Sequence, residues 1–226
     1  MIFALGQPVA LAGLLLAFVL ALVLRAVVQH VLARRLVPGA ARPPLFHLQR
    51  DADIFGVVGA VFGGTGWGRP APLPDYHPAW RPRDAGRRAV VLLAGPLVPI
   101  ALSQVLLAAY PALGGTPLEL ALASPGTTLV GQPGPATAQF LLSLAVGLLC
   151  FGLLDLVPLP PLDGWELLRL AVRREGPGMQ RARHWLVDQN LGTAILVIGM
   201  LPLFGGVGLW VVVLDAVGTP LLGPWR

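Results

Sequence analysis

The sequence predicts an all-α, polytopic membrane protein in which residues 1–226 form a single membrane domain. Of its 226 residues, 55% are hydrophobic and only 12% are charged, and the mean hydropathy is +0.74. Its apolar runs are long, and no polar stretch between them is large enough to bury a core of its own. Because backbone groups inside a bilayer must hydrogen-bond internally, such runs span it as helices.

Four stretches are each long and apolar enough to cross a hydrocarbon core about 30 Å thick. We predict about four transmembrane helices, with spans over 7–28, 89–111, 136–157 and 192–216. Residues 54–67, "IFGVVGAVFGGTGW", form a shorter apolar run with five glycines. Because this run is too short to span comfortably, we predict a re-entrant or interfacial segment there.

The charges predict the topology. All 16 basic residues are Arg, and 15 of them fall within 25–50, 69–88 and 169–183, whereas 112–135 has none. By the positive-inside rule we expect the three Arg-rich segments to be cytoplasmic and both termini to lie outside. The exclusive use of Arg, with abundant Ala, Gly and Pro, suggests a bacterial inner membrane. The sequence pI of about 10.9 then reflects topology and contact with the lipid bilayer, and predicts no nucleic-acid partner. This arrangement requires 54–67 to return to its own side.

Residues 156–164 read "LVPLPPLDG", which places an ionisable Asp163 behind three prolines. This stretch resembles a signature of the site-2 protease family, the intramembrane zinc metalloproteases (peptidase M50-like). Two more stretches resemble family blocks in the same order, "ADIFGVVGAVFGGTGWGRPAPL" from Ala52 and "RRAVVLLAGPLVPIAL" from Arg87. The resemblance covers roughly residues 20–170 and implies a site-2 protease-like core.

In that family a His-Glu-x-x-His motif near the end of the first conserved span binds zinc, and the Asp of Leu-Asp-Gly is the third ligand. The matching helix end here reads "LRAVVQHVLARRL" and places Arg25, Ala26 and Gln29 at the motif's three chemical positions. An Arg offers no lone pair, an Ala has no ligand atom, and a Gln amide is a poor zinc ligand. The resemblance therefore implies a vestigial site in which only Asp163 persists, without metal or other cofactor.

Two hypotheses explain what the carboxylate of Asp163 does. Both Arg25 and Asp163 occupy ligand positions of one ancestral site, so they are expected to form an ion pair in which the guanidinium replaces the charge of the metal. In the other hypothesis, Arg25 extends to the cytoplasmic interface while Asp163 caps the helix that begins at Gly164 or Trp165. The two hypotheses are compatible in part.

The resemblance also implies a role for "GWGRPAPL", which in the family forms an extended segment that pairs with a substrate's backbone. The partner-binding residues implied here are Gly66, Trp67, Arg69, Pro70 and Pro72. We therefore predict a non-catalytic homologue, or pseudoprotease, that binds a transmembrane partner as a regulator or as an accessory subunit of a larger membrane complex.

Two alternatives stay open. An active zinc metalloprotease with atypical ligands would need a rebuilt site, for example from His30, His47 and Asp163, and its general base would be unassigned. A small transporter or channel would need a polar path through the spans. The polar residues of the spans are scattered and are typical of helix packing: Ser103, Gln104, Gln139, Ser143 and Asp155.

Overall fold

The computed structural model describes residues 1–37, 39, 44–70, 73–74, 82–131, 134–172, 176–203 and 206–225. Over these residues the chain folds into helices joined by turns, and they contain no β-strand, only an isolated bridge. The expected all-α class is therefore confirmed for the described part of the chain.

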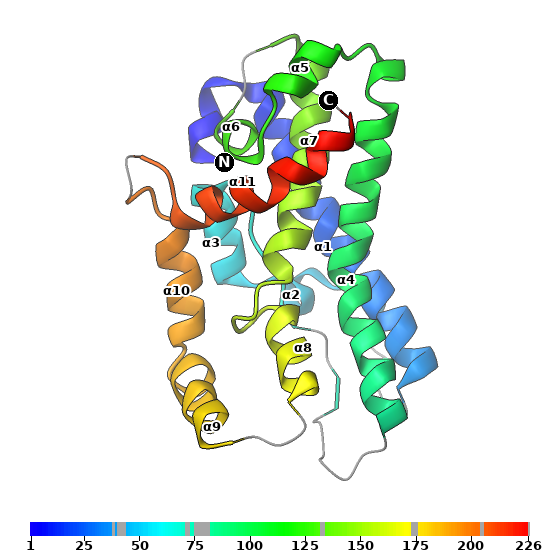
Figure 1. Ribbon diagram of the computed structural model, residues 1–226, viewed down its shortest axis with the longest axis vertical. Helices are drawn as coiled ribbons and strands as arrows, with labels where there is room; N and C mark the ends of the chain where they lie inside the picture. Colours follow the sequence, from blue (N-terminus) through cyan, green and yellow to red (C-terminus); the bar gives the residue numbers. More distant parts are fainter. Residues whose placement is uncertain are drawn as a thin grey trace.

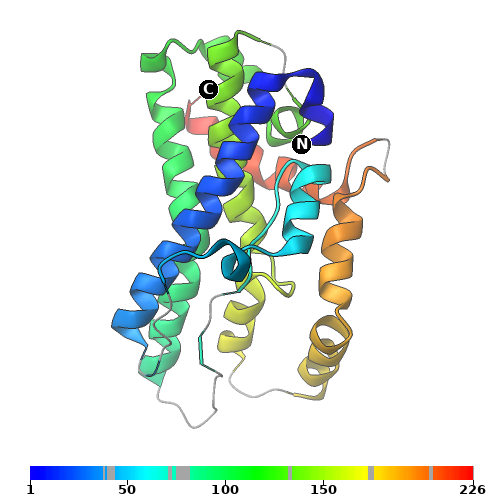
Figure 2. The ribbon, with the colours of Figure 1, turned by 180° about the vertical axis from the view of Figure 1, so that it is seen from behind.

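Three long helices build the core of the molecule: α1 (Pro8–Leu36), α4 (Pro82–Ala109) and α7 (Ala136–Asp155). Each is long and apolar enough to cross a membrane. They pack against one another along the long axis of the molecule (Figure 1 and Figure 2). The first three predicted spans are thus confirmed as helices of spanning length.

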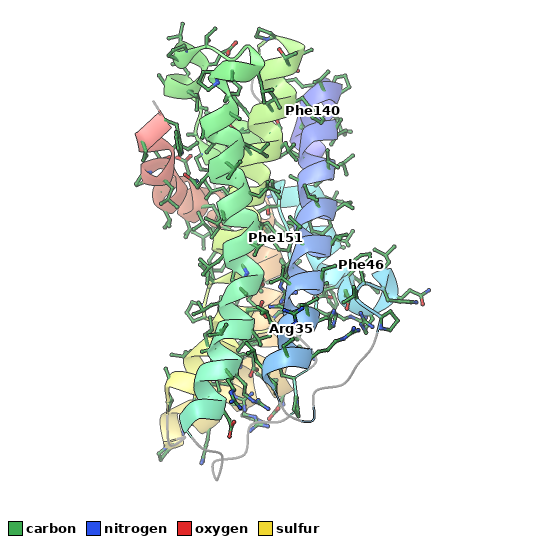
Figure 3. All side chains as sticks on the ribbon, turned by 90° about the vertical axis from the view of Figure 1, so that its right-hand side faces the viewer. Arg35, Phe46, Phe140 and Phe151 are labelled. Atoms are coloured by element: carbon green, nitrogen blue, oxygen red, sulfur yellow. The ribbon has the colours of Figure 1, made fainter. Side chains whose placement is uncertain are left out.

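The helix α7 is the most enclosed of the three. Its Phe151 is fully buried and meets Phe18 of α1 edge to face, with ring centroids 6.1 Å apart; Figure 3 shows Phe151 about midway along the bundle. A Cβ on Gly147 would lie 2.6 Å from the Cβ of Ala17. Small residues at this contact let α1 and α7 approach closely, as is common between membrane helices.

The prediction of one helix over 192–216 is wrong. These residues form two helices, α10 (Leu191–Met200) and α11 (Leu209–Leu222), and α11 crosses in front of α7 instead of continuing along α10 (Figure 1). The residue before a proline is disfavoured in the helical conformation, and Leu201, which precedes Pro202, is extended. Beyond it Gly206 takes a φ of 89°, which suits glycine.

Residues 54–67 form a hairpin that returns to its own start. The helix α3 (Ile54–Gly63) ends at Gly64, whose φ of 80° is left-handed, and the chain then runs back. Ala52 and Gly68 form an isolated antiparallel bridge, and the Arg69 N–H donates to the Asp51 carbonyl at 2.9 Å. This is the path expected of a re-entrant segment, and α3, cyan in Figure 2, packs against α10.

The hairpin closes around Trp67, which is fully buried. Its indole Nε1 donates to Asp53 Oδ2 at 2.8 Å. A Cβ on Gly59 would lie 2.7 Å from Trp67 Cζ3, and a Cβ on Gly56 would overlap the Trp67 backbone. Glycine is therefore required at both positions, because the returning chain lies directly on the helix.

Short helices cover the two ends of the bundle (Figure 1). One end carries η1 (Ile2–Gly6), η2 (Pro111–Leu113), α5 (Pro117–Leu122), α6 (Pro125–Val130) and η4 (Gly223–Trp225). Towards the other lie α2 (Leu48–Asp51), α8 (Asp163–Ala171), α9 (Pro177–Arg183) and the π-helical turn η3 (His184–Asp188). The last turn of α1, the start of α4 and the helices α8 and α9 share this second end, so the Arg-rich segments lie on one side.

Candidate functional site

A buried cluster of charged side chains lies where α1, α7 and α8 meet. Arg25 of α1 is 2% exposed, and Asp155 of α7 and Asp163 of α8 are fully buried. Charges removed from water are costly unless they are paired and hydrogen-bonded. The contacts among these three side chains therefore decide what the cluster can do.

Arg25 and Asp163 form a two-pronged ion pair. Arg25 Nε donates to Asp163 Oδ2 at 3.0 Å, and Arg25 Nη2 donates to Asp163 Oδ1 at 2.7 Å. This fork geometry is the strong form of a guanidinium–carboxylate contact. The structure thus brings together the two residues whose pairing was hypothesised. The carboxylate of Asp163 does not cap α8, whose N-cap is Leu162.

One helical turn after Arg25, Gln29 reaches the same carboxylate. Its amide Nε2 donates to Asp163 Oδ2, and Gln29 is also buried. Gly95, in the Ala-Gly-Pro stretch of α4, leaves the room for this contact: a Cβ there would lie 3.0 Å from Asp163 Oδ2 and still closer to the Gln29 amide. Ala26, beside Arg25, is buried and brings no polar group to the site.

Sequence reasoning missed Asp155, which it treated as a polar group that packs between helices. Its Oδ2 lies 2.6 Å from Arg25 Nε. The Nε hydrogen is directed to Asp163, however, and neither Asp155 oxygen accepts a hydrogen bond from the described residues. Two carboxylates thus share one guanidinium. The signal available in the sequence was the position of Asp155 directly before "LVPLPPLDG", where the site-2 protease signature that this stretch resembles begins with Asn.

The hairpin closes another side of the cluster. Arg25 Nη1 donates to the Arg69 carbonyl at 2.6 Å, so the guanidinium is engaged by α8 and by the hairpin at once. A Cβ on Gly68 would lie 2.9 Å from the same Nη1. The buried ion pair therefore fixes the position of the hairpin's last residues.

The predicted partner-binding residues divide into two groups. Gly66 and Trp67 are buried inside the hairpin and support it, while Arg69 and Pro70 are exposed. Pro72 lies outside the described residues. Of the described members, only Arg69 and Pro70 present an accessible surface, and the segment forms no regular strand.

The residues of the cluster do not fit zinc. The guanidinium of Arg25 has no lone pair and already contacts Asp163, the only carboxylate of the proposed ligand set. His30 points its Nδ1 at the Leu45 carbonyl, 2.9 Å away, and His47 is exposed at the start of α2. Among the described residues, no three His, Cys, Asp or Glu side chains gather in a group that could hold a metal ion.

Comparison of the chain with known protein families, characterised proteins and solved structures finds no match. The relation to the site-2 proteases accordingly rests on the three sequence blocks and stays a prediction. The helical membrane architecture and the contacts of the buried cluster stand independently of it.

Proposed function

We propose that this chain is a non-catalytic homologue of the site-2 proteases that binds a transmembrane partner, as a regulator or as an accessory subunit of a membrane complex. One observation carries the proposal: Arg25 and Gln29, one helical turn apart, both donate to the carboxylate of Asp163. The three positions that the resemblance assigns to zinc ligands therefore meet at one point, with a guanidinium where the metal's charge would be.

The side chains at this point argue against hydrolysis. A zinc peptidase needs a metal-activated water and a general base. Arg25 is permanently protonated and engaged by Asp163, and Ala26 stands where the base would be. The site keeps a geometry that holds helices together, and its residues lack the chemistry for cleavage.

The hairpin supports a binding role. Its last residues, Arg69 and Pro70, are exposed, while the Arg69 backbone is held at its N–H by Asp51 and at its carbonyl by Arg25. With the backbone of Arg69 held in this way, the side chains of Arg69 and Pro70 form a fixed, exposed surface that a partner can contact. The partner proposed is a transmembrane protein that approaches from the Arg-rich, cytoplasmic side of a bacterial inner membrane.

Zinc content and proteolysis test the loss of chemistry. We expect detergent-purified wild-type protein to contain no stoichiometric zinc and to leave a model transmembrane substrate uncleaved. In the triple variant Arg25→His, Ala26→Glu, Gln29→His, both new imidazoles replace side chains that already reach Asp163, so we expect about one zinc per chain. Adding Asp163→Ala to this variant is the matched control and should abolish zinc binding.

Two outcomes contradict the proposal. Wild-type protein that carries one zinc per chain and loses it with Asp163→Ala would be a metalloprotein with an unrecognised ligand set. A folded triple variant without zinc would mean that the three positions do not form an ancestral metal site.

Photocrosslinking tests the binding role separately. A photoreactive amino acid at Pro70, in native membranes, should yield one discrete adduct with a membrane protein, and the same probe at exposed Gly178 of α9 should not. Equal adduct patterns from both positions, or adducts with lipid alone, would contradict a partner site at the hairpin.

A further inference from the structure

A pocket of about 670 Å³ lies between the hairpin and α10. Asp53, Phe55 and Arg69 line it from the hairpin, and residues from Gln189 to Ile198 line it from the start of α10 and the turn before it. Pockets of a few hundred to about 1,000 Å³ are typical of small-molecule sites. Arg69 links this pocket to the buried cluster. It lines the pocket, and its carbonyl accepts a hydrogen bond from Arg25.

The pocket is polar at one end and apolar at the other. Asp53, Arg69 and Asn190 lie where the hairpin starts and ends and where α10 begins. Val197 and Ile198 line the pocket near the far end of α10, and Ile198 is 54% exposed. Phe55, which is 55% exposed, lies in the first turn of α3 beside the polar end. Two large apolar side chains beside a polar end match a ligand that is itself amphipathic.

A chain of contacts links the polar end of the pocket to residues just beyond the predicted end of the first span. His30 lies two residues beyond the predicted end of the first span, and its Nδ1 contacts the Leu45 carbonyl just before α2. The last residue of α2, Asp51, accepts a hydrogen bond from the Arg69 N–H. For the proposal below we take Arg69 and Asp53 to lie at headgroup depth, with α3 and α10 running from there into the apolar layer.

The polar end carries one charge of each sign. The carboxylate of Asp53 is fixed, because Oδ2 accepts from the Trp67 indole at 2.8 Å and Oδ1 accepts from the Phe55 N–H at 3.2 Å. The Arg69 guanidinium supplies the positive charge. We propose that this pocket binds a phospholipid whose headgroup carries both a phosphate and a protonated primary amine, as in phosphatidylethanolamine.

In this complex the lipid phosphate contacts Arg69, and its ammonium group donates to Asp53. An acyl chain lies along Val197 and Ile198. A purely anionic headgroup would satisfy Arg69 and meet repulsion from Asp53, and a choline headgroup has no N–H to donate. The inference does not depend on the proposed function, because it needs only the pocket and its charges.

The test is lipid titration of the delipidated, detergent-purified full chain, followed by native mass spectrometry. Phosphatidylethanolamine, phosphatidylcholine and phosphatidylglycerol with identical acyl chains are compared. Since a charge-assisted hydrogen bond contributes about 1.5 to 3 kcal/mol, we expect phosphatidylethanolamine to bind roughly tenfold or more tightly than phosphatidylcholine. Phosphatidylglycerol should also bind more weakly than phosphatidylethanolamine.

Variants separate the two contacts. Arg69→Gln keeps the backbone contacts of the hairpin and should weaken phosphatidylethanolamine and phosphatidylglycerol binding by about tenfold. Asp53→Asn should erase the preference for phosphatidylethanolamine over phosphatidylcholine. Arg181→Gln removes an exposed arginine on α9. It is the control for the loss of a positive charge elsewhere and should leave the affinities for all three lipids unchanged.

Equal affinity for the three lipids would overturn the inference, as would equal effects of Arg69→Gln and Arg181→Gln. If Asp53→Asn fails to fold, the wild-type lipid comparison and Arg69→Gln still decide the question. If wild-type protein shows no lipid selectivity but still forms the protein adduct at Pro70, the lipid site is rejected and the proposed function stands.

Discussion

The charges around Arg25 do not balance. One guanidinium faces the carboxylates of Asp155 and Asp163 in a buried site, and it donates its hydrogen bonds to Asp163 and to the Arg69 carbonyl. Asp163 is also held by Gln29. Asp155 contacts the guanidinium at 2.6 Å but accepts no hydrogen bond from the described residues. Because a buried carboxylate that lacks hydrogen-bond donors is costly, Asp155 is the residue at which this site can be improved.

We predict that Asp155→Asn stabilises the protein by about 1 to 3 kcal/mol, because it removes one of two like charges and adds an amide donor. Thermal unfolding in detergent measures the effect. Asp163→Asn is the matched control and should destabilise the protein, since it removes the carboxylate charge and leaves Arg25 one acceptor oxygen in place of two. A lower melting temperature for Asp155→Asn would mean that its negative charge is needed by Arg25.

At the scale of elements, the hairpin formed by α3 and the segment that returns beside it depends on glycines as much as on hydrogen bonds. Gly56 and Gly59 face Trp67 without side chains between them. The hairpin's final residues are then secured by Asp51 and Arg25. The end of the hairpin, from Trp67 to Arg69, is therefore held both by packing against the glycines of α3 and by hydrogen bonds from outside the hairpin.

We expect Gly56→Ala to destabilise the protein by about 1 to 3 kcal/mol, because the new methyl group overlaps the Trp67 backbone and forces a shift. Gly86→Ala in α4 is the control: a Cβ there meets open space, and the substitution should be neutral or stabilising by up to about 1 kcal/mol. Both are compared by thermal unfolding. Equal melting temperatures would show that the hairpin relaxes without cost.

The turn at α2 should loosen in acid. Burial raises the pKa of Asp51, but hydrogen bonds from Arg50 and the His47 N–H, with the charge of Arg50, outweigh it, so the net pKa lies below its ordinary value of 3.8. A lowered folded pKa contributes stability that is present above 3.8 and is lost as pH falls through the folded value. Melting temperatures of wild type and Asp51→Asn should therefore differ above this range and converge below it. A constant difference at all pH values would contradict this linkage.

At the scale of the whole molecule, three helices of spanning length form the bundle, and the described parts of the Arg-rich segments lie towards one end of it (Figure 1). The last apolar region does not add a fourth continuous helix, because α10 and α11 run in different directions. The α11 helix packs on α6 and α7 instead. The predicted membrane topology of the bundle can be tested without disturbing the fold.

Cysteine labelling measures this sidedness. The native Cys150 is fully buried and should be inert, so it serves as the background. Gly134→Cys and Gly178→Cys place thiols where a Cβ meets nothing within 4 Å. We expect an impermeant maleimide to label position 134 in intact cells, and position 178 only after the inner membrane is opened. The reverse pattern would invert the topology.

Hydropathy suffices to predict three helices of spanning length and the returning segment, while the pairing of Arg25 and Asp163 is predicted from the resemblance to the site-2 proteases. Hydropathy can do this because span length and helical periodicity are local properties of the chain. The helix break at Leu201 also has a local signal, because Pro202 follows it. The prediction gave more weight to the length of the apolar run and so missed the break.

Long-range packing alone decides that Asp155 joins Arg25, that Trp67 turns inward, and that the hairpin and α10 enclose an amphipathic pocket. These outcomes depend on which helices touch and on where glycine lets two backbones meet. No single segment contains that information, because a buried charge finds its partner only after distant helices have packed.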